Sequence, residues 1–90
     1  MCDDFEWDPE KARANRRKHG VSFSEASTIF DDLRAITIEE QDIGGEERSI
    51  TVGMDCYGRL LVVVYAYRGN KIRIISARKA NEYERIEYER

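Results

Sequence analysis

The sequence predicts an α+β domain in which helices from both ends of the chain pack against one antiparallel sheet. Apolar residues in the first third recur at helical spacing, residues 34–79 alternate between apolar and polar positions, and the tail returns to helical spacing. Helices and strands that are segregated along the chain are typical of this class, whereas parallel-sheet folds alternate them. The 90 residues are expected to form a single domain, residues 1–90.

The chain opens with a short strand and a basic helix. The stretch "FEWD" alternates apolar and polar residues, which predicts a strand at its Phe5–Trp7 part. The stretch "DPEKARANRRKHG" predicts a helix: Asp8 suits the N-cap, Pro9 the first turn and Gly20 the position after the end. Its apolar side is thin, so the helix should pack lightly and expose its cations.

A second helix is predicted at about residues 23 to 31, as an element of the core. Ser22 and Glu25 form the S-x-x-E pattern of a capping box. The apolar stripe that follows consists of Phe23, Ala26, Ile29, Phe30 and Leu33.

The second half of the chain predicts three or four antiparallel strands and a C-terminal helix. The stretches "RAITIEEQ" and "ERSITVGMD" alternate and are separated by Gly44 and Gly45, a hairpin signal. The run "LLVVVYAY" is almost continuously apolar, which predicts a central strand covered on both faces. "KIRIIS" follows as the next strand, and "ARKANEYERIEYER" has helical spacing.

Charge is distributed unevenly along the chain. The formal net charge is −3, from 15 basic and 18 acidic residues, and this total favours no class of partner. However, residues 11–18 and residues 68–79 each carry five cations and no acid. A protein that is acidic overall can therefore present a basic face.

Several classes of protein are disfavoured. Cys2 and Cys56 have no CxxC spacing and no histidine cluster, so neither a zinc site nor a structural disulfide is expected. No signal peptide is recognisable, and the longest apolar run, Leu60–Ala66, is too short to span a membrane. We expect a cytoplasmic protein without a cofactor. Since no metal-binding spacing, P-loop or nucleophile elbow occurs, an enzyme with this sequence should not depend on a metal.

His19, the single histidine, has two interpretations. It follows Arg16, Arg17 and Lys18 in "RRKHG", where it would transfer a proton beside phosphate-binding cations. Alternatively, it closes the apolar side of the helix, and its cationic neighbours complement the helix dipole. Spacing alone favours the second interpretation.

Two further groups of residues combine charge with a strand position. Glu47 and Arg48 are adjacent on a predicted strand and should point to opposite faces, and solvated charges beside a turn are the simpler interpretation. Arg73 interrupts an apolar strand, where a guanidinium needs an acidic partner or an anion-binding groove. Tyr65 and Tyr67 share one face of the central strand and either stack on bases or pack in the core.

The order and spacing of these motifs resemble those of the BrnT family of bacterial toxins. The resemblance covers Phe5 to Tyr88 and rests on "WD…N…KHGVSF…A…F.D", "ER…G" and "R…RIISARKA…E". It implies a RelE-like fold and an endoribonuclease of a type II toxin–antitoxin system, which cleaves cellular RNA and arrests growth. Together with the metal independence expected from the residues, this predicts a 2′,3′-cyclic phosphate product. It also implies a BrnA-like antitoxin with a ribbon-helix-helix DNA-binding part, so that operator DNA is bound only through the toxin–antitoxin complex.

The resemblance also suggests roles for particular residues. His19 would carry the proton, and Glu47 is the alternative base. The phosphate would be held by Lys18, Arg48, Arg73 and Arg78. RNA-binding residues would be Arg16, Arg17, Arg68, Tyr65 and Tyr67. The competing interpretation is a non-catalytic module whose basic helix binds nucleic acid or whose C-terminal helix binds a protein partner.

Overall fold

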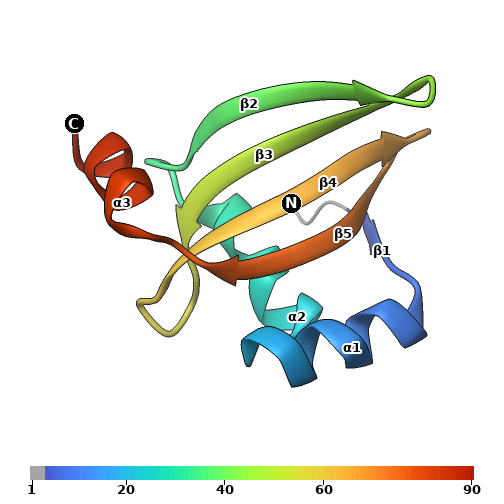
Figure 1. Ribbon diagram of the computed structural model, residues 1–90, viewed down its shortest axis with the longest axis horizontal. Helices are drawn as coiled ribbons and strands as arrows, with labels where there is room; N and C mark the ends of the chain where they lie inside the picture. The colour runs from blue at the N-terminus through green and yellow to red at the C-terminus, as the bar shows by residue number, and fades with distance from the viewer. Residues whose placement is uncertain (1–3) are drawn as a thin grey trace.

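A computed structural model describes residues 4–90, which form one five-stranded sheet flanked by helices, in the strand order β1-β5-β4-β3-β2 (Figure 1). Cys2 lies outside the described residues. The strands are β1 Asp4–Glu6, β2 Ile36–Ile43, β3 Glu46–Met54, β4 Leu60–Arg68 and β5 Lys71–Lys79. The helices are α1 Pro9–His19, α2 Phe23–Ala26, the 3-10 helix η1 Ser27–Asp31 and α3 Glu82–Glu89. The α+β class is therefore confirmed.

The sheet is larger than predicted, and it is mixed. Strands β2 to β5 pair antiparallel, as predicted, because short turns connect them. Strand β1, however, joins the sheet in parallel with β5, with Phe5 opposite Ile72 and Glu6 opposite Arg73. Helices α1, α2 and η1 and three strands separate β1 from β5 in the chain, so no tight turn forces an antiparallel pairing. The RelE-like arrangement stays a prediction.

Both predicted helix starts are confirmed at atomic detail. Asp8 accepts a hydrogen bond from the Glu10 amide at 2.9 Å, and Gly20 ends α1 with a φ of 71°. Ser22 and Glu25 form the predicted capping box. After one turn, however, the second helix tightens into η1 and ends at Asp31, since Asp32 is extended. Leu33 is consequently fully exposed, and its predicted place in the core stripe is wrong.

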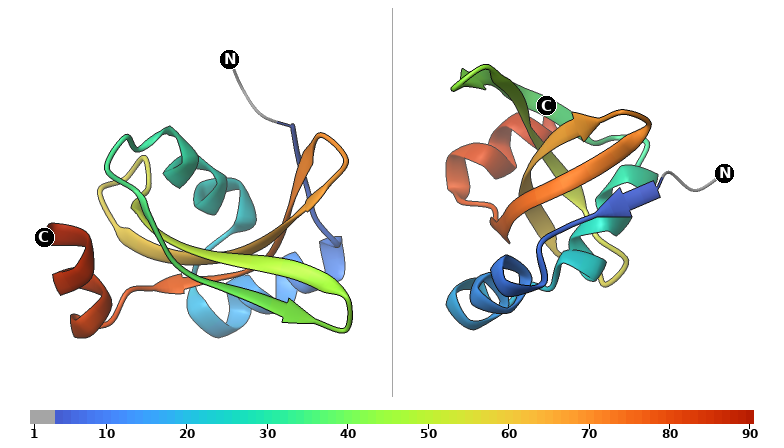
Figure 2. Two further views of the ribbon diagram at one scale, coloured as in Figure 1. Left: turned by 90° about the horizontal axis from the view of Figure 1, so that it is seen from above. Right: turned by 90° about the vertical axis from the view of Figure 1, so that its right-hand side faces the viewer.

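Helices η1 and α3 lie on opposite faces of the sheet, and α1 runs along the β5 edge (Figure 2). On the η1 face, Phe23 and Ile29 pack with Leu61, Val63 and other buried residues. On the α3 face, a smaller cluster contains Val52, Leu60 and Val62, with Tyr88 of α3 packed against it. Strand β4 is thus central and covered on both faces over its first half, as predicted.

Helix α3 is attached mainly through polar side chains. Tyr88 donates a hydrogen bond to Asp32 at 2.7 Å, and Glu84 is buried against Arg78. Tyr83 and Ile86, which have helical spacing in the sequence, point instead to solvent, with 68% and 48% exposed. Within residues 4–90, no helix has the length and apolar character needed to cross a membrane.

Candidate active site

Four arginines of the sheet share the face that also carries α3; we call this the arginine face. On β4, Val62, Val64 and Ala66 alternate on that face, and their β5 partners are Arg78, Ser76 and Arg73. Arg68 continues the same alternation along β4. On β3, Arg48 alternates with Ile50 and Val52, which pair with Val64 and Val62. The arginine face therefore consists of Arg48, Arg68, Arg73 and Arg78.

A β-bulge at Ile75 makes this arrangement possible. The register of β5 against β4 shifts between Val64 and Tyr65, which leaves Ile75 without a paired residue. Without the extra residue, Arg73 and Ser76, three positions apart, would lie on opposite faces. The bulge places both on the arginine face and bends the exposed edge of β5.

Each arginine of this face is paired with a carboxylate of the chain. Glu46 bonds both Arg48 (Nε to Oε1, 3.3 Å) and Arg68 (Nη2 to Oε2, 2.7 Å). Arg73 donates to Glu6 at 3.3 Å, and Arg78 donates to both oxygens of Glu84. Four cations thus face three carboxylates, so the arginines are oriented but largely neutralised.

These pairings shift the pKa values of the acids. The hydrogen bonds of Arg68 hold the pKa of Glu46 below its ordinary value, although partial desolvation opposes this effect. Those of Arg78 lower the pKa of Glu84 in the same way. Both carboxylates therefore stay ionised and bound to their arginines well below neutral pH.

His19 lies in a groove between α1 and the β5 edge. Its walls include Lys11, Asn15, Lys18 and His19 from α1, and Ile75 and Ser76 from β5; we call it the His19 groove. Ser76 lines the groove and also belongs to the arginine face, between Arg73 and Arg78 on β5. The groove therefore borders the arginine face. His19 is half-buried at the last helical position. The structure thus brings Lys18 and His19 to the same side of the molecule as the arginines.

The cations of α1 are less neutralised than those of the sheet. Arg13 is paired with Glu10 at 3.0 Å. Within the described part of the chain, Lys11, Arg16, Arg17 and Lys18 are exposed and form no ion pair. The strongest positive field that an incoming phosphate meets therefore comes from α1 and not from the arginine face.

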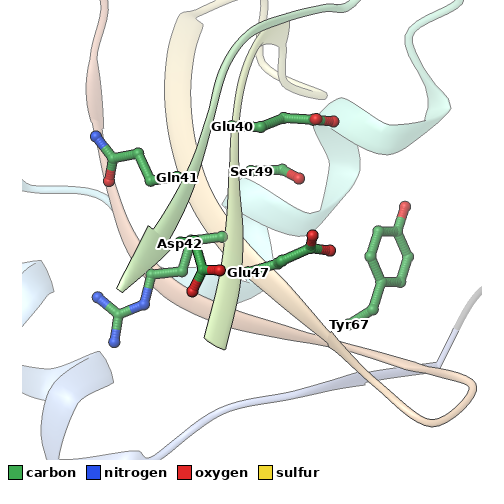
Figure 3. A pocket seen from close by; sticks show the side chains of 7 residues that line it. Glu40, Gln41, Asp42, Glu47, Ser49 and Tyr67 are labelled. Atoms are coloured by element: carbon green, nitrogen blue, oxygen red, sulfur yellow. The ribbon is translucent and has the colours of Figure 1, made fainter. Parts of the chain in front are cut away.

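Glu47 lies on the opposite face, away from this arrangement. In the β2–β3 register it lies opposite Asp42. It lines a pocket that we call the acidic pocket, because it contains the carboxylates of Glu40, Asp42 and Glu47, together with Gln41, Arg48, Ser49 and Tyr67. In Figure 3 the side chains of Glu40, Glu47 and Ser49 extend toward the Tyr67 side of the hairpin, whereas Gln41 points away. The predicted opposite orientation of Glu47 and Arg48 is confirmed, and the structure does not bring Glu47 together with His19.

The two candidate stacking tyrosines differ in accessibility. Tyr65 is 5% exposed, and its hydroxyl lies 2.9 Å from that of Thr51 inside the core. Of the two predicted alternatives, Tyr65 therefore packs in the core, where its ring is not accessible to a base. Tyr67 is 67% exposed and contacts the Tyr65 ring edge-on, at 5.8 Å between centroids.

Sequence reasoning missed several residues of this region. Ser76 and Lys11 line the His19 groove, and Glu6 and Glu46 orient the arginines. The requirement that Arg73 have an acidic partner was the one signal available, but it did not identify Glu6, 67 residues away. Nothing in the sequence marked Ser76, because its place depends on the bulge.

Comparison with known proteins identifies the family. A family model described as "Ribonuclease toxin, BrnT, of type II toxin-antitoxin system" matches residues 7–84. The chain belongs to the BrnT family. Members are thus described as ribonuclease toxins, and a type II system pairs such a toxin with a cognate antitoxin. None of the curated proteins compared matches the chain.

The fold agrees with this assignment. The crystal structure of the Brucella abortus ribonuclease toxin BrnT superposes with a TM-score of 0.69 at 23% identity. The match covers 88% of this chain and 97% of the Brucella chain. The BrnT fold therefore extends over nearly the whole of the described structure.

Proposed function

We propose that this protein is a metal-independent endoribonuclease that cleaves cellular RNA and arrests growth. Its membership in a family of ribonuclease toxins supports the reaction class. The observation that carries the assignment of the site is the His19 groove, which combines an imidazole, unpaired lysines and a hydroxyl beside the arginine face. These groups supply a proton acceptor and positive charge without a metal.

The proposed chemistry uses the RNA itself as nucleophile. His19 accepts the proton of a ribose 2′-OH, and the 2′-oxygen attacks the adjacent phosphorus. The bond from phosphorus to the 5′-oxygen breaks, and that oxygen takes a proton from water. The products are a 2′,3′-cyclic phosphate and a 5′-hydroxyl. Lys18 and Lys11 lie where charge accumulates on the phosphate oxygens and stabilise it.

Arg73 is the arginine best placed to assist. It flanks the bulge that forms the groove wall, and its single bond to Glu6, at 3.3 Å, is longer than the other arginine pairs except Arg48–Glu46. A phosphate therefore displaces Glu6 more easily than it displaces Glu84 from Arg78. The flanking RNA backbone is bound by Arg48, Arg68, Arg16 and Arg17. Tyr67 lies with Glu47 on the opposite face, so it would contact an unpaired base only of RNA that passes around the edge of the sheet. Glu47 has no part in the reaction.

The proposal includes the biological setting. The toxin acts in the cytoplasm and is neutralised by a BrnA-like antitoxin whose ribbon-helix-helix part binds operator DNA for the complex. Support for this setting is the family assignment to type II systems.

The test is cleavage of RNA by the purified protein in the presence of EDTA, with analysis of the product ends. We expect 2′,3′-cyclic phosphate ends, at a rate that EDTA leaves unchanged. His19→Ala and Lys18→Ala should each lower the rate by about 10²-fold or more, the usual contribution of general acid–base or charge stabilisation. Arg13→Ala removes one charge from α1 outside the His19 groove and is the charge-matched control for Lys18→Ala, with a rate close to the parental one.

Three outcomes would contradict the proposal. A folded His19→Ala variant that cleaves at the parental rate excludes His19 as proton carrier. Loss of cleavage in EDTA excludes the metal-independent mechanism. Salt-sensitive RNA binding without any cleavage supports a non-catalytic binding module instead.

A further inference from the structure

Asn15 joins α1 to the edge of the sheet through three hydrogen bonds. Its Nδ2 donates to the Ala77 carbonyl at 2.8 Å and to the Val21 carbonyl at 3.0 Å, and its Oδ1 accepts from the Ala77 amide at 3.1 Å. The side chain is buried at 8% exposure. Both amide hydrogens and the amide oxygen are therefore used, which few side chains can do.

The two bonds to Ala77 replace a neighbouring strand. Strand β1 pairs with β5 only as far as Arg73, so the rest of the β5 edge has no strand partner among the described residues. An adjacent antiparallel strand would occupy the N–H and C=O of one residue together, as the Asn15 amide does at Ala77. The helix is thereby held at one fixed point of the strand, directly after Ser76.

The third bond fixes the chain beyond the helix. The Val21 carbonyl follows Gly20, whose φ of 71° turns the backbone at the end of α1. The segment from Asn15 to Val21 is thus held at both ends, and His19 lies inside it. Lys11, Lys18 and His19 are four, three and four residues from Asn15, so all three lie on its side of the helix. The hydrogen bonds of Asn15 therefore hold the part of α1 from which Lys11, Lys18 and His19 extend into the groove.

We propose that Asn15 is a positioning residue that sets the distance of His19 and Lys18 from Ser76 and thus aligns the groove for catalysis. This inference rests on the proposed function and deepens it. No other polar residue of similar size serves at this place: an aspartate would have no N–H to donate and would set its charge against two carbonyls. A displacement of about 1 Å at a reacting group can cost about 10²-fold in rate.

The inference is tested by a double-mutant cycle between Asn15→Ala and His19→Ala, with RNA cleavage measured at saturating RNA. Alone, Asn15→Ala should lower kcat by about 10- to 100-fold with little change in KM. In the His19→Ala background the further loss should be clearly smaller, because no imidazole remains to be aligned and only the placement of Lys18 is still affected. Asn15→Gln keeps the amide one methylene further out and should fold with a smaller loss of kcat. Asn15→Ala leaves buried backbone groups unpaired and could prevent folding. In that case the test is made with Asn15→Gln.

Thr51→Val is the matched control, because it removes buried hydroxyl contacts to Thr37 and Tyr65 away from the groove. It should lower stability and leave kcat of the folded protein unchanged. A parental kcat in folded Asn15→Ala or Asn15→Gln overturns the inference alone. An equal loss in the parental and His19→Ala backgrounds also overturns it alone, because it indicates a general structural effect. A parental rate in His19→Ala overturns the proposed function and this inference with it.

Discussion

Arg78 meets Glu84 through two parallel hydrogen bonds, from Nη1 to Oε1 at 2.9 Å and from Nη2 to Oε2 at 2.7 Å. Glu84 also accepts the backbone N–H of Asn81. The pair connects β5 to α3, and it is a two-point contact that a phosphate would have to break. Arg78 is therefore first of all a connection between sheet and helix, and its predicted role as a phosphate clamp is secondary to that.

Glu84→Gln should lower the free energy of unfolding by about 1 kcal/mol, a modest value because 42% of the Arg78 side chain is exposed to solvent. The folded-state pKa of Glu84 lies below the ordinary 4.5. The stabilisation that the Glu84 carboxylate provides is thus complete above the pKa of Glu84 in the unfolded chain. It is lost as the pH falls through the lower pKa of Glu84 in the folded protein. Urea denaturation at neutral pH and in acid measures both effects. If the free energies of unfolding of the parent and of Glu84→Gln still differ in strong acid, this explanation is wrong.

Asp55 is the most enclosed carboxylate of an ion-pair network between α2 and the β3–β4 turn. It accepts from the amides of Tyr57 and Arg59 and from the Arg59 guanidinium, which also reaches Glu25 at 3.0 Å. Burial alone would raise the pKa of Asp55, but the bonds from Arg59 and the backbone outweigh it and lower the pKa.

Asp55→Asn should therefore cost about 2 kcal/mol in stability at neutral pH, since a charged acceptor with several donors is lost. The stabilisation is complete above the unfolded-state pKa and disappears in acid as Asp55 takes up a proton. Guanidinium denaturation provides the measurement. Glu89→Gln, at an exposed pair 3.8 Å from Arg85, is the control and should change stability little. Equal effects of the two substitutions would refute a special role for Asp55.

Gly53 lies where η1 packs tightly against β3. A Cβ at this position would lie 3.0 Å from the Ile29 Cβ and 3.1 Å from the Ala35 Cβ. Gly53→Ala should lower stability by about 1–3 kcal/mol through overpacking. Ser49→Ala, on the same face of β3 but beside the open acidic pocket, should have a small effect. The midpoints of thermal denaturation of the two variants, each compared with the parent, provide the measurement. An unchanged midpoint for Gly53→Ala would contradict the prediction and show that η1 can move away from β3.

Glu47 and Arg73 allow the alternative base to be tested. Because Glu47 lies on the face opposite the arginine face, Glu47→Gln should retain the parental rate of RNA cleavage. Arg73→Ala should lower it by about 10-fold or more, since a charged contact to phosphate is lost. Cleavage assays on both folded variants decide the point. If Glu47→Gln is as slow as His19→Ala, the assignment of the active site to the His19 groove is wrong.

Local chemistry explains which parts of the fold were predictable. Caps such as Asp8, Ser22 and Gly20 act on their own neighbours, so their sequence patterns were sufficient. The parallel pairing of Phe5 with Ile72 depends on contacts far apart in the chain and was not predicted. Leu33 had the right spacing for a core stripe, but the helix tightened and ended before it, which spacing does not encode.

The candidate site was predictable in its residue types and only partly in its geometry. Strand alternation correctly separated Glu47 from Arg48. The bulge at Ile75, which aligns Arg73 with Ser76, follows from how β5 fits β4 and has no local signal. The neutralisation of the arginines by Glu6, Glu46 and Glu84 likewise arises only when distant segments meet.

The unpaired cations of α1 and the acids of the β2–β3 hairpin lie on opposite sides of the sheet, because α1 lies beside β5 and β2 forms the far edge (Figure 1). The molecule is consequently an electric dipole despite its small net charge. The electric field of a polyanion such as RNA orients the protein before contact, so that the His19 groove faces the RNA when the two collide. Association with RNA should then be fast at low ionic strength and slow steeply as salt shortens the range of that field.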